Sequence, residues 1–296
     1  MEKITVLAPA KINLFLDVCA RRPDGYHDIE SVMQTVTLFD RVEITKYDGT
    51  MGAQIGISCS VSAVPSDEKN IVYRVAKAFF AYVNIPMYHV DFSIDKKIPV
   101  EAGLGGGSAD AAAAIIGLDR LYETKLSVEQ MCEIGVTVGA DVPFCIKKGT
   151  ATAEGIGEIL KSCPPMPDCA ILIAMPAGSK ISTAEAYRKI DSMENTPHAT
   201  LADMLEALRT CDLEALSRVL YNKFEAVTPE ETGAASLREQ MLSLGAVGAR
   251  MSGSGPSVFG IFRTVAEAKH AADALENEAR VFVCAPCQAD VPTFEL

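Results

Sequence analysis

The 296-residue chain has no apolar run long enough to cross a membrane and no basic leader followed by an apolar segment. A spanning helix needs about 18 or more apolar residues in succession, and a secretory leader begins with basic residues before its apolar stretch. The first eight residues, Met1 to Ala8, meet neither requirement. We therefore expect a soluble, unsecreted, cytoplasmic protein.

Basic residues are also scarce, with 27 Lys and Arg against 39 Asp and Glu and a formal net charge of -12. Surfaces that bind nucleic acid or anionic membranes gather basic charge. The composition argues against both partners and favours small molecules. At first sight the same acidity also argues against phosphate ligands.

Only four histidines are present, and the nine cysteines are odd in number and widely spread. Small secreted domains show a compact, even-numbered set of cysteines instead. Cys284 and Cys287 have CxxC spacing, but no second CxxC is present to complete a zinc shell. We interpret these thiols as residues at a strand end in a reducing compartment.

The pattern of the first half indicates strands followed by helices. Short β-rich runs cover 4–7, 12–19, 31–37, 41–44, 55–59 and 89–94. Helical spacing covers 70–83 and 109–122, and Ser127 with Gln130 forms a capping box that opens another helix. This order predicts an α+β fold rather than a regularly alternating one.

Prolines at 164, 165 and 167 interrupt the pattern and predict a boundary between two domains, 1–163 and 164–296. Beyond it, strands are expected at 170–174, 248–251, 257–262 and 280–284. Helices are expected at 182–191, 201–208, 212–221, 229–244 and 266–275. Together they predict a small sheet backed by helices.

The strongest chemical signal is a run of four glycines in five residues, 103–107, directly before an Ala-rich helix. Glycines allow close approach of backbone N–H groups to a ligand, and a helix N-terminus favours anions. The segment therefore predicts a phosphate cradle, although neither the dinucleotide fingerprint nor the P-loop pattern fits. The alternative is a plain turn with Ser108 as the helix N-cap. Asp110 near the helix start is explained by the helix dipole alone.

A second Gly-rich element, residues 252–257, stands between two strand-like runs. Alone it indicates a hairpin turn, and it does not fit the G-x-S-x-G nucleophile elbow because Ser252 occupies the first Gly position.

Two charged residues stand in otherwise apolar surroundings. Lys11 interrupts an apolar strand, where a buried ammonium needs an anionic partner. Asp141 precedes Pro143 and either caps a short helix or pairs with Lys11 to accept or orient a hydroxyl proton. An outward-facing Lys11 stays an open alternative.

Tyr26 and His27 offer an aromatic face and a ring nitrogen for a planar base, unless they simply belong to a surface turn.

In combination, residues 9–14, 103–109 and 252–256 resemble the three ordered motifs of the GHMP small-molecule kinases. The resemblance spans essentially the whole chain. It implies two α+β domains with the site between them, ATP as phosphoryl donor and Mg²⁺ as cofactor. The segments 24–27 and 139–144 narrow the implied substrate to diphosphocytidyl methylerythritol, an intermediate of isoprenoid precursor synthesis. The implied assembly is a monomer or a weak homodimer.

The resemblance also assigns roles residue by residue. Asp141 would be the catalytic base and Lys11 its charged partner, while Asn13 would orient the substrate or Asp141. Tyr26 and Tyr187 would cover the two faces of cytosine, and His27 would bond its edge. ATP would be bound by Asn70, Lys97, Pro99, Val100, Glu101, Ala102, Gly103, Leu104, Gly105, Gly106, Gly107, Ser108, Ala109, Gly253, Ser254 and Gly255.

The middle motif is one residue longer than the Gly-Leu-Gly-Ser-Ser-Ala form of other GHMP kinases. Which hydroxyl reaches Mg²⁺ therefore stays open, and Ser108 is the candidate. Three alternatives remain: another GHMP kinase acting on homoserine or mevalonate, a catalytically silent nucleotide-binding regulator, and a structural or interaction protein with Gly-rich turns. A silent regulator would be expected to lose Lys11 or Asp141, and both are present.

Overall fold

Two long antiparallel strands, β1 (Glu2–Arg21) and β2 (His27–Lys46), form the spine of the molecule. The computed structural model describes residues 1–47, 52, 54–87, 89–178, 181–193, 199–289 and 293–295. The sequence predicted each long strand as two short ones. The pairing register shifts between Pro9 and Lys11 and between Asn13 and Phe15. Such irregularities interrupt the alternation on which strand prediction depends.

The spine belongs to a seven-stranded sheet with the path β3-β4-β2-β1-β8, and β5 pairs with both β2 and β6. The added strands are β3 (Ile55–Cys59), β4 (Val90–Asp95), β5 (Thr150–Glu154), β6 (Ile159–Ser162) and β8 (Tyr221–Asn222). β3 and β4 confirm predicted strands. The short strands β5, β6 and β8 were not predicted.

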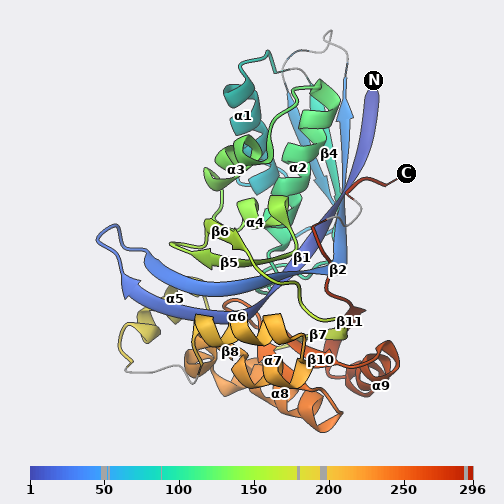
Figure 1. Cartoon of the computed structure of the whole chain (residues 1–296). Helices are drawn as coiled ribbons and strands as arrows, with labels where there is room; N and C mark the ends of the chain where they lie inside the picture. The colour runs from blue at the N-terminus through green and yellow to red at the C-terminus, as the bar shows by residue number, and fades with distance from the viewer. Residues whose placement is uncertain are drawn as a thin grey trace.

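Four helices pack with this sheet: α1 (Ile71–Val83), α2 (Gly106–Tyr122), α3 (Val128–Val136) and α4 (Val142–Lys147) (Figure 1). Asn70 caps α1, and Ser127 forms the predicted capping box with Gln130. The Ala-rich stretch of α2 lies close to the sheet because its residues are small. A Cβ added at Gly117 would lie 2.3 Å from the Ile44 side chain.

A second, four-stranded sheet has the order β11-β7-β10-β9 and confirms the predicted helix-backed sheet. Its strands are β7 (Ala170–Pro176), β9 (Gly248–Met251), β10 (Val258–Phe262) and β11 (Ala279–Cys284). The helices of this half are α5 (Thr183–Ile190), α6 (Leu201–Thr210), α7 (Leu213–Val219), α8 (Ala234–Ser243) and α9 (Val265–Leu275). Short 3₁₀ helices cover Lys223–Val227 and Glu230–Thr232. Cys284 ends β11, as the strand-end interpretation of the two thiols expected.

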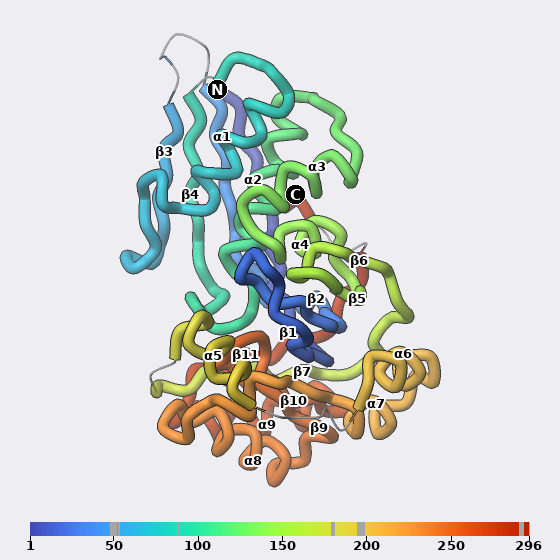
Figure 2. Tube along the Cα trace, turned by 90° about the vertical axis from the view of Figure 1, so that its left-hand side faces the viewer, coloured from blue at the N-terminus to red at the C-terminus, as the bar shows by residue number. Residues whose placement is uncertain are grey.

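The two halves are joined by more than one crossing of the chain. Figure 2 shows the β1–β2 hairpin between the helices of the first half and the second sheet. α7 ends at Val219, before the predicted end at Tyr221, because Tyr221 and Asn222 pair with β1 instead. The C-terminal segment also returns to the first sheet, where Phe294 bridges to Val6. The domain boundary after residue 163 stays a prediction.

None of the helices in the described part of the chain has the length and apolarity that a membrane crossing requires.

Candidate active site

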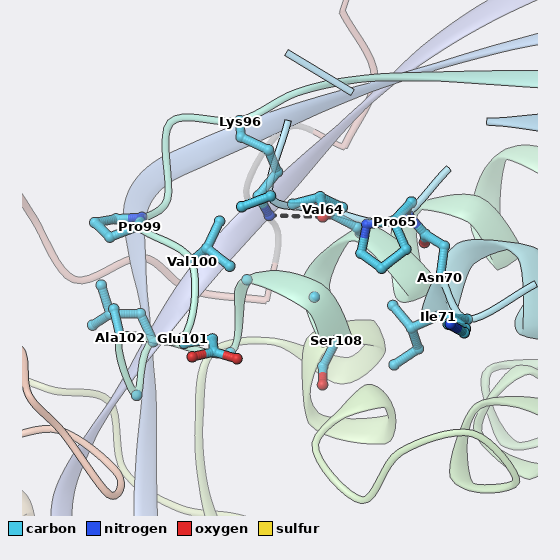
Figure 3. A pocket seen from close by; sticks show the side chains of 18 residues that line it. Val64, Pro65, Asn70, Ile71, Lys96, Pro99, Val100, Glu101, Ala102 and Ser108 are labelled. Carbon is cyan, nitrogen blue, oxygen red and sulfur yellow. Dashed lines mark hydrogen bonds and ion pairs between the residues drawn. The ribbon is translucent and has the colours of Figure 1, made fainter. Parts of the chain in front are cut away.

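The Gly-rich loop forms one wall of a cavity of about 440 Å³. Figure 3 shows Pro99, Val100 and Ala102 on one side of this space and Pro65 and Asn70 on the other. Every position from Pro99 to Ser108 lines it. We refer to it as the donor cavity, because the Gly-rich loop is expected to bind the phosphoryl donor.

Helix α2 begins at Gly106, with Gly105 as its N-cap in the left-handed region at φ 69°. The alternative in which Ser108 caps the helix is therefore wrong, because Ser108 is already the third helical residue. The earlier start leaves the N–H groups of Gly106, Gly107 and Ser108 in the first turn, where no intrahelical acceptor exists. These amides and the helix dipole form an anion-binding geometry beside the donor cavity.

The Gly-rich loop is bonded to both other motifs. The Lys11 N–H donates to the Leu104 carbonyl at 3.0 Å, which attaches the loop to β1. On the other side, the Ser252 hydroxyl donates to the Gly103 carbonyl at 2.9 Å. A Cβ at Gly103 would lie 2.0 Å from the Ser252 carbonyl oxygen. Glycine is therefore required where this loop meets the 252–257 segment.

The segment 252–257 is a hairpin turn between the antiparallel strands β9 and β10, and the Ser252 N–H donates to the Ser257 carbonyl. The hairpin interpretation is confirmed. The turn nevertheless reaches the first half of the chain, because the Gly253 N–H donates to Asn13 Oδ1 at 3.0 Å. The three motifs therefore meet at one place.

Lys11 and Asp141 lie at this meeting point. Lys11 Nζ is 3.5 Å from Asp141 Oδ2, with side-chain exposures of 7% and 31%, so an outward-facing Lys11 is wrong. Lys11 Nζ also donates to Asn13 Oδ1 at 2.8 Å. Asp141 occupies the N-cap position of α4, yet its side chain makes no capping bond. The carboxylate is therefore available to a group in the cavity that it lines.

Tyr26, His27 and Tyr187 line a second cavity, of about 640 Å³. His27 is buried, and its Nε2 lies 2.6 Å from Asp191 Oδ1. Its ring stacks on Tyr187, with centroids 4.7 Å apart. Tyr26 is 61% exposed at the rim. Burial and the nearby Asp141 carboxylate raise the pKa of Tyr187 to about 12, which keeps its hydroxyl neutral.

A central cavity of about 250 Å³ connects the other two. It shares Gly103 and Gly105 with the donor cavity, and it shares Thr183 and Tyr187 with the aromatic one. Lys11, Asn13 and Asp141 line it between these two ends. A buried ammonium and a carboxylate thus stand between the Gly-rich loop and an aromatic pocket.

Beneath the donor cavity, Lys96 is buried between two carboxylates, 2.5 Å from Asp40 Oδ2 and 2.7 Å from Asp110 Oδ2. Burial alone would lower the pKa of Lys96, but the two carboxylates raise it. Burial raises the pKa of Asp110 to about 8, against the opposing effect of Lys96. Asp40 also accepts from the Ile98 N–H at 2.8 Å, so this cluster fixes the start of the loop.

Of the predicted site residues, all except Lys97, Ala109 and Gly255 line one of these three cavities. The Lys97 side chain is 60% exposed and lies 3.6 Å from Asp95, whereas its neighbour Lys96 lines the donor cavity. Asn70 lines that cavity too, with its side chain bonded to Val72 and Pro65.

Sequence reasoning missed Lys96, although strand parity could have found it. Val90, Phe92 and Ile94 are the buried positions of β4, and Lys96 continues the same parity. It also missed Ser31, which accepts from Asn13 at 2.9 Å, and Asp191 beside His27. No local pattern marks those two residues, because each acts on a partner distant in sequence.

Comparison with known proteins agrees with this geometry. The sequence profile of the GHMP kinases N terminal domain matches residues 70–149, and that of the GHMP kinases C terminal domain matches residues 204–280. The chain belongs to the GHMP kinase family, and the α+β fold expected from the resemblance is confirmed.

Within that family, two similar curated relatives bear the same name. The 4-diphosphocytidyl-2-C-methyl-D-erythritol kinase of Lachnoclostridium phytofermentans is 42% identical over 88% of this chain and 89% of its own length. The enzyme of the same name from Geobacter metallireducens is 40% identical over 96% of this chain and 98% of its own.

Solved structures show the same relationship. A crystal structure of 4-(cytidine 5'-diphospho)-2C-methyl-D-erythritol kinase superposes with a TM-score of 0.80 at 30% identity, covering 96% of this chain and 99% of that one. Homoserine kinase from Cytophaga hutchinsonii superposes with a TM-score of 0.75 at 20% identity, covering 98% and 96%. The second likeness is one of fold alone.

Proposed function

We propose that this protein transfers the γ-phosphoryl group of ATP to the 2-hydroxyl of 4-diphosphocytidyl-2-C-methyl-D-erythritol. The observation that carries the proposal is the order of the three cavities. The Gly-rich loop lies at one end, the Lys11–Asp141 pair in the middle and the Tyr26–His27 pocket at the other end. The relatives named above support the choice of acceptor.

In this proposal the loop amides and the α2 N-terminus hold the ATP phosphates. The acceptor hydroxyl lies at Asp141, which takes or orients its proton. The hydroxyl oxygen forms a bond to the γ-phosphorus as the bond to the β–γ bridging oxygen breaks, and ADP leaves. Lys11 places positive charge beside the carboxylate and the transferring group. Phosphoryl transfer requires mainly such positioning and charge stabilisation from a protein.

The nucleoside end of the acceptor fits the aromatic cavity. The exposed Tyr26 ring offers a stacking face, and His27 is held by Asp191 and Tyr187. A ring fixed in this way loses little further freedom when a base binds. We assign Tyr26, His27 and Tyr187 to the cytosine moiety and Asn13 to the hydroxyl-bearing end.

Mg²⁺ fits the donor cavity as a cofactor shared with substrate. Among the described residues, no cluster of three or more His, Cys, Asp and Glu side chains is arranged to hold a metal ion. Mg²⁺ keeps several waters and takes its other ligands from phosphates and one or two protein oxygens, so a protein cage is not required. Ser108, which lines the cavity, is the residue proposed to reach it. When bound, Mg²⁺ neutralises phosphate charge.

The test is a substrate panel with the purified chain, ATP and Mg²⁺. The diphosphocytidyl compound, homoserine and mevalonate are compared by kcat/KM, and the product is examined by phosphorus NMR. A phosphomonoester on the 2-hydroxyl of the diphosphocytidyl compound supports the proposal. Preference for homoserine or mevalonate would replace it with another kinase of the family, and nucleotide binding without transfer would indicate a silent regulator.

A further inference from the structure

The residues that follow α7 contact both halves of the molecule. Strand β8 pairs in parallel with β1, Tyr221 opposite Phe15 and Asn222 opposite Leu16. Residues 222–225 then run beside Met251 at the end of β9, the outer strand of the four-stranded sheet. This short segment is therefore placed to set the position of one half against the other.

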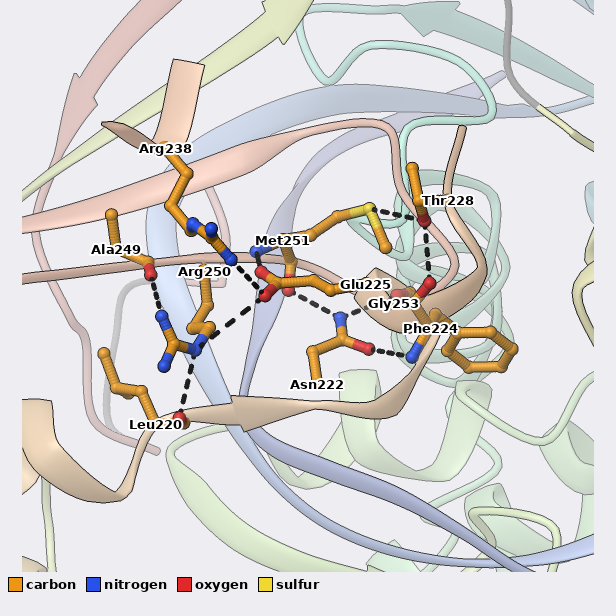
Figure 4. Close-up of polar contacts among 10 residues, drawn as sticks. All are labelled: Leu220, Asn222, Phe224, Glu225, Thr228, Arg238, Ala249, Arg250, Met251 and Gly253. Carbon is orange, nitrogen blue, oxygen red and sulfur yellow. Dashed lines mark hydrogen bonds and ion pairs between the residues drawn. The ribbon is translucent and has the colours of Figure 1, made fainter. Parts of the chain in front are cut away.

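Asn222 makes the central contacts of this segment (Figure 4). It is 4% exposed, and its Nδ2 donates to the Met251 carbonyl at 2.6 Å and to the Gly253 carbonyl at 2.9 Å. Its Oδ1 accepts from the Phe224 N–H at 2.9 Å. A primary carboxamide can donate two bonds and accept one in this way, whereas a carboxylate cannot donate.

Of the two carbonyls held by Asn222, that of Met251 ends β9 and that of Gly253 belongs to the hairpin at 252–257. Gly253 is bonded on both sides: its carbonyl to Asn222, and its N–H to Asn13 Oδ1 at 3.0 Å. The same Asn13 oxygen accepts from Lys11 Nζ at 2.8 Å. Asn222 therefore holds the peptide groups on both sides of the one that bears the Gly253 N–H, and that N–H bonds to the Asn13 oxygen that also accepts from Lys11.

Glu225 supports the same hairpin from the other side of Met251. Its Oε1 accepts from the Met251 N–H at 2.7 Å, and its Oε2 accepts from Arg238 at 2.9 Å. Arg250 lies 4.0 Å from the same carboxylate (Figure 4). Both polar groups of the Met251 backbone are thus held by the 222–225 segment.

We propose that Asn222 is a positioning residue for phosphoryl transfer, fixing the hairpin so that Gly253 and Asn13 hold Lys11 beside Asp141. Asn222 is buried behind the hairpin, whereas Gly253 and Ser254 line the central cavity. It acts through these neighbours rather than by touching substrate. This inference rests on the proposed function.

The test compares Asn222→Ala with Gln34→Ala. Gln34 is a matched control because it is a buried carboxamide with the same contact pattern, donating to Thr35 and Cys287 and accepting from Thr150. Asn222→Ala should lower kcat by about 10- to 100-fold, because small displacements of reacting groups are that costly. ATP affinity should stay within about twofold, since the donor cavity is lined by other residues. Gln34→Ala should lower Tm comparably but keep kcat; equal kcat losses in both variants would overturn the proposal.

A double-mutant cycle with Asn13→Ala tests whether Asn222 affects kcat through Asn13. If Asn222 acts through Asn13, its substitution should have little further effect on kcat in the Asn13→Ala background. Independent, multiplying losses would overturn the inference.

Glu225→Gln provides a second variant if Asn222→Ala does not fold, since loss of the carboxylate charge weakens both the bond to Met251 and the ion pairs with Arg238 and Arg250 that hold this side chain against the hairpin. Lower kcat with unchanged ATP affinity supports the inference, and unchanged kcat contradicts it. Absence of transfer in the wild-type protein would instead reject the proposed function.

Discussion

Lys11 Nζ lies 3.5 Å from Asp141 Oδ2, although Lys11 is on strand β1 and Asp141 immediately precedes α4. A buried ammonium is costly without an anionic partner, and Asp141 supplies that partner from a distant segment of the chain. The pair also lines the cavity that connects the donor and aromatic ends. This relationship underlies the predictions that follow.

Asp141→Asn removes the proposed proton acceptor while keeping its shape. We expect kcat to fall by at least about two decades, because a general base contributes typically ~10²–10⁴-fold. ATP binding, measured by titration calorimetry, should be nearly unchanged. Asp273→Asn, at an exposed position on α9, is the control and should keep full activity. Near-wild-type turnover of Asp141→Asn would refute the assignment.

Tyr26→Ala should act on substrate binding rather than on the chemical step. The 61% exposed ring is free to stack on a base, and such stacking contributes roughly 1–3 kcal/mol. KM for the diphosphocytidyl substrate should therefore rise about 5- to 150-fold, with KM for ATP unchanged. Tyr82→Ala, which removes another exposed ring on α1, should leave both values alone. An unchanged substrate KM in Tyr26→Ala would show that the ring does not stack.

Gly103→Ala should disrupt the contact between the Gly-rich loop and the hairpin. The added Cβ would lie 2.0 Å from the Ser252 carbonyl oxygen, and the glycine has φ 79°. We expect a loss of ATP affinity of at least about tenfold, because the loop amides must move away from the hairpin. Gly245→Ala imposes a similar backbone strain at φ 99° but has nothing within 4 Å. Equal ATP affinities for the two variants would contradict the steric account.

Asp110→Asn should change how stability depends on pH. Burial raises the folded-state pKa of Asp110 to about 8, above the value of 3.8 for an exposed aspartate. The folded protein therefore holds a proton that the unfolded chain releases, and this stabilisation is lost as the pH rises from about 4 through about 8. The Tm of wild type should fall relative to that of Asp110→Asn over this range. Parallel Tm curves would show that Asp110 is ionised throughout.

Much of the fold could be predicted because its signals are local. Asn70 and Ser127 mark helix starts by short-range capping, and both helices form where expected. The ends of long strands were harder, since the register shifts near Lys11 and Asn13 depend on pairing with β2. β8 was not predicted, and its first residue, Tyr221, was expected to end a helix, because the pairing partner of this strand, β1, lies far away in the sequence.

The same difference between local signals and contacts from distant segments applies to the candidate site. Glycine spacing indicated the phosphate loop, because backbone geometry there is set within a few residues. Lys96, Asp191 and Asn222 were missed, since their partners come from distant segments. The net charge of -12 misled about phosphate for a related reason. Loop amides and a few buried cations such as Lys11 and Lys96 act locally, and total charge does not report them.

The most direct test of the account is ADP release by the purified chain with ATP and Mg²⁺, measured by a coupled assay with and without 4-diphosphocytidyl-2-C-methyl-D-erythritol. The account predicts ADP formation that depends on this compound and saturates with it. ADP release unaffected by the compound, or none at all in its presence, would contradict the assigned acceptor.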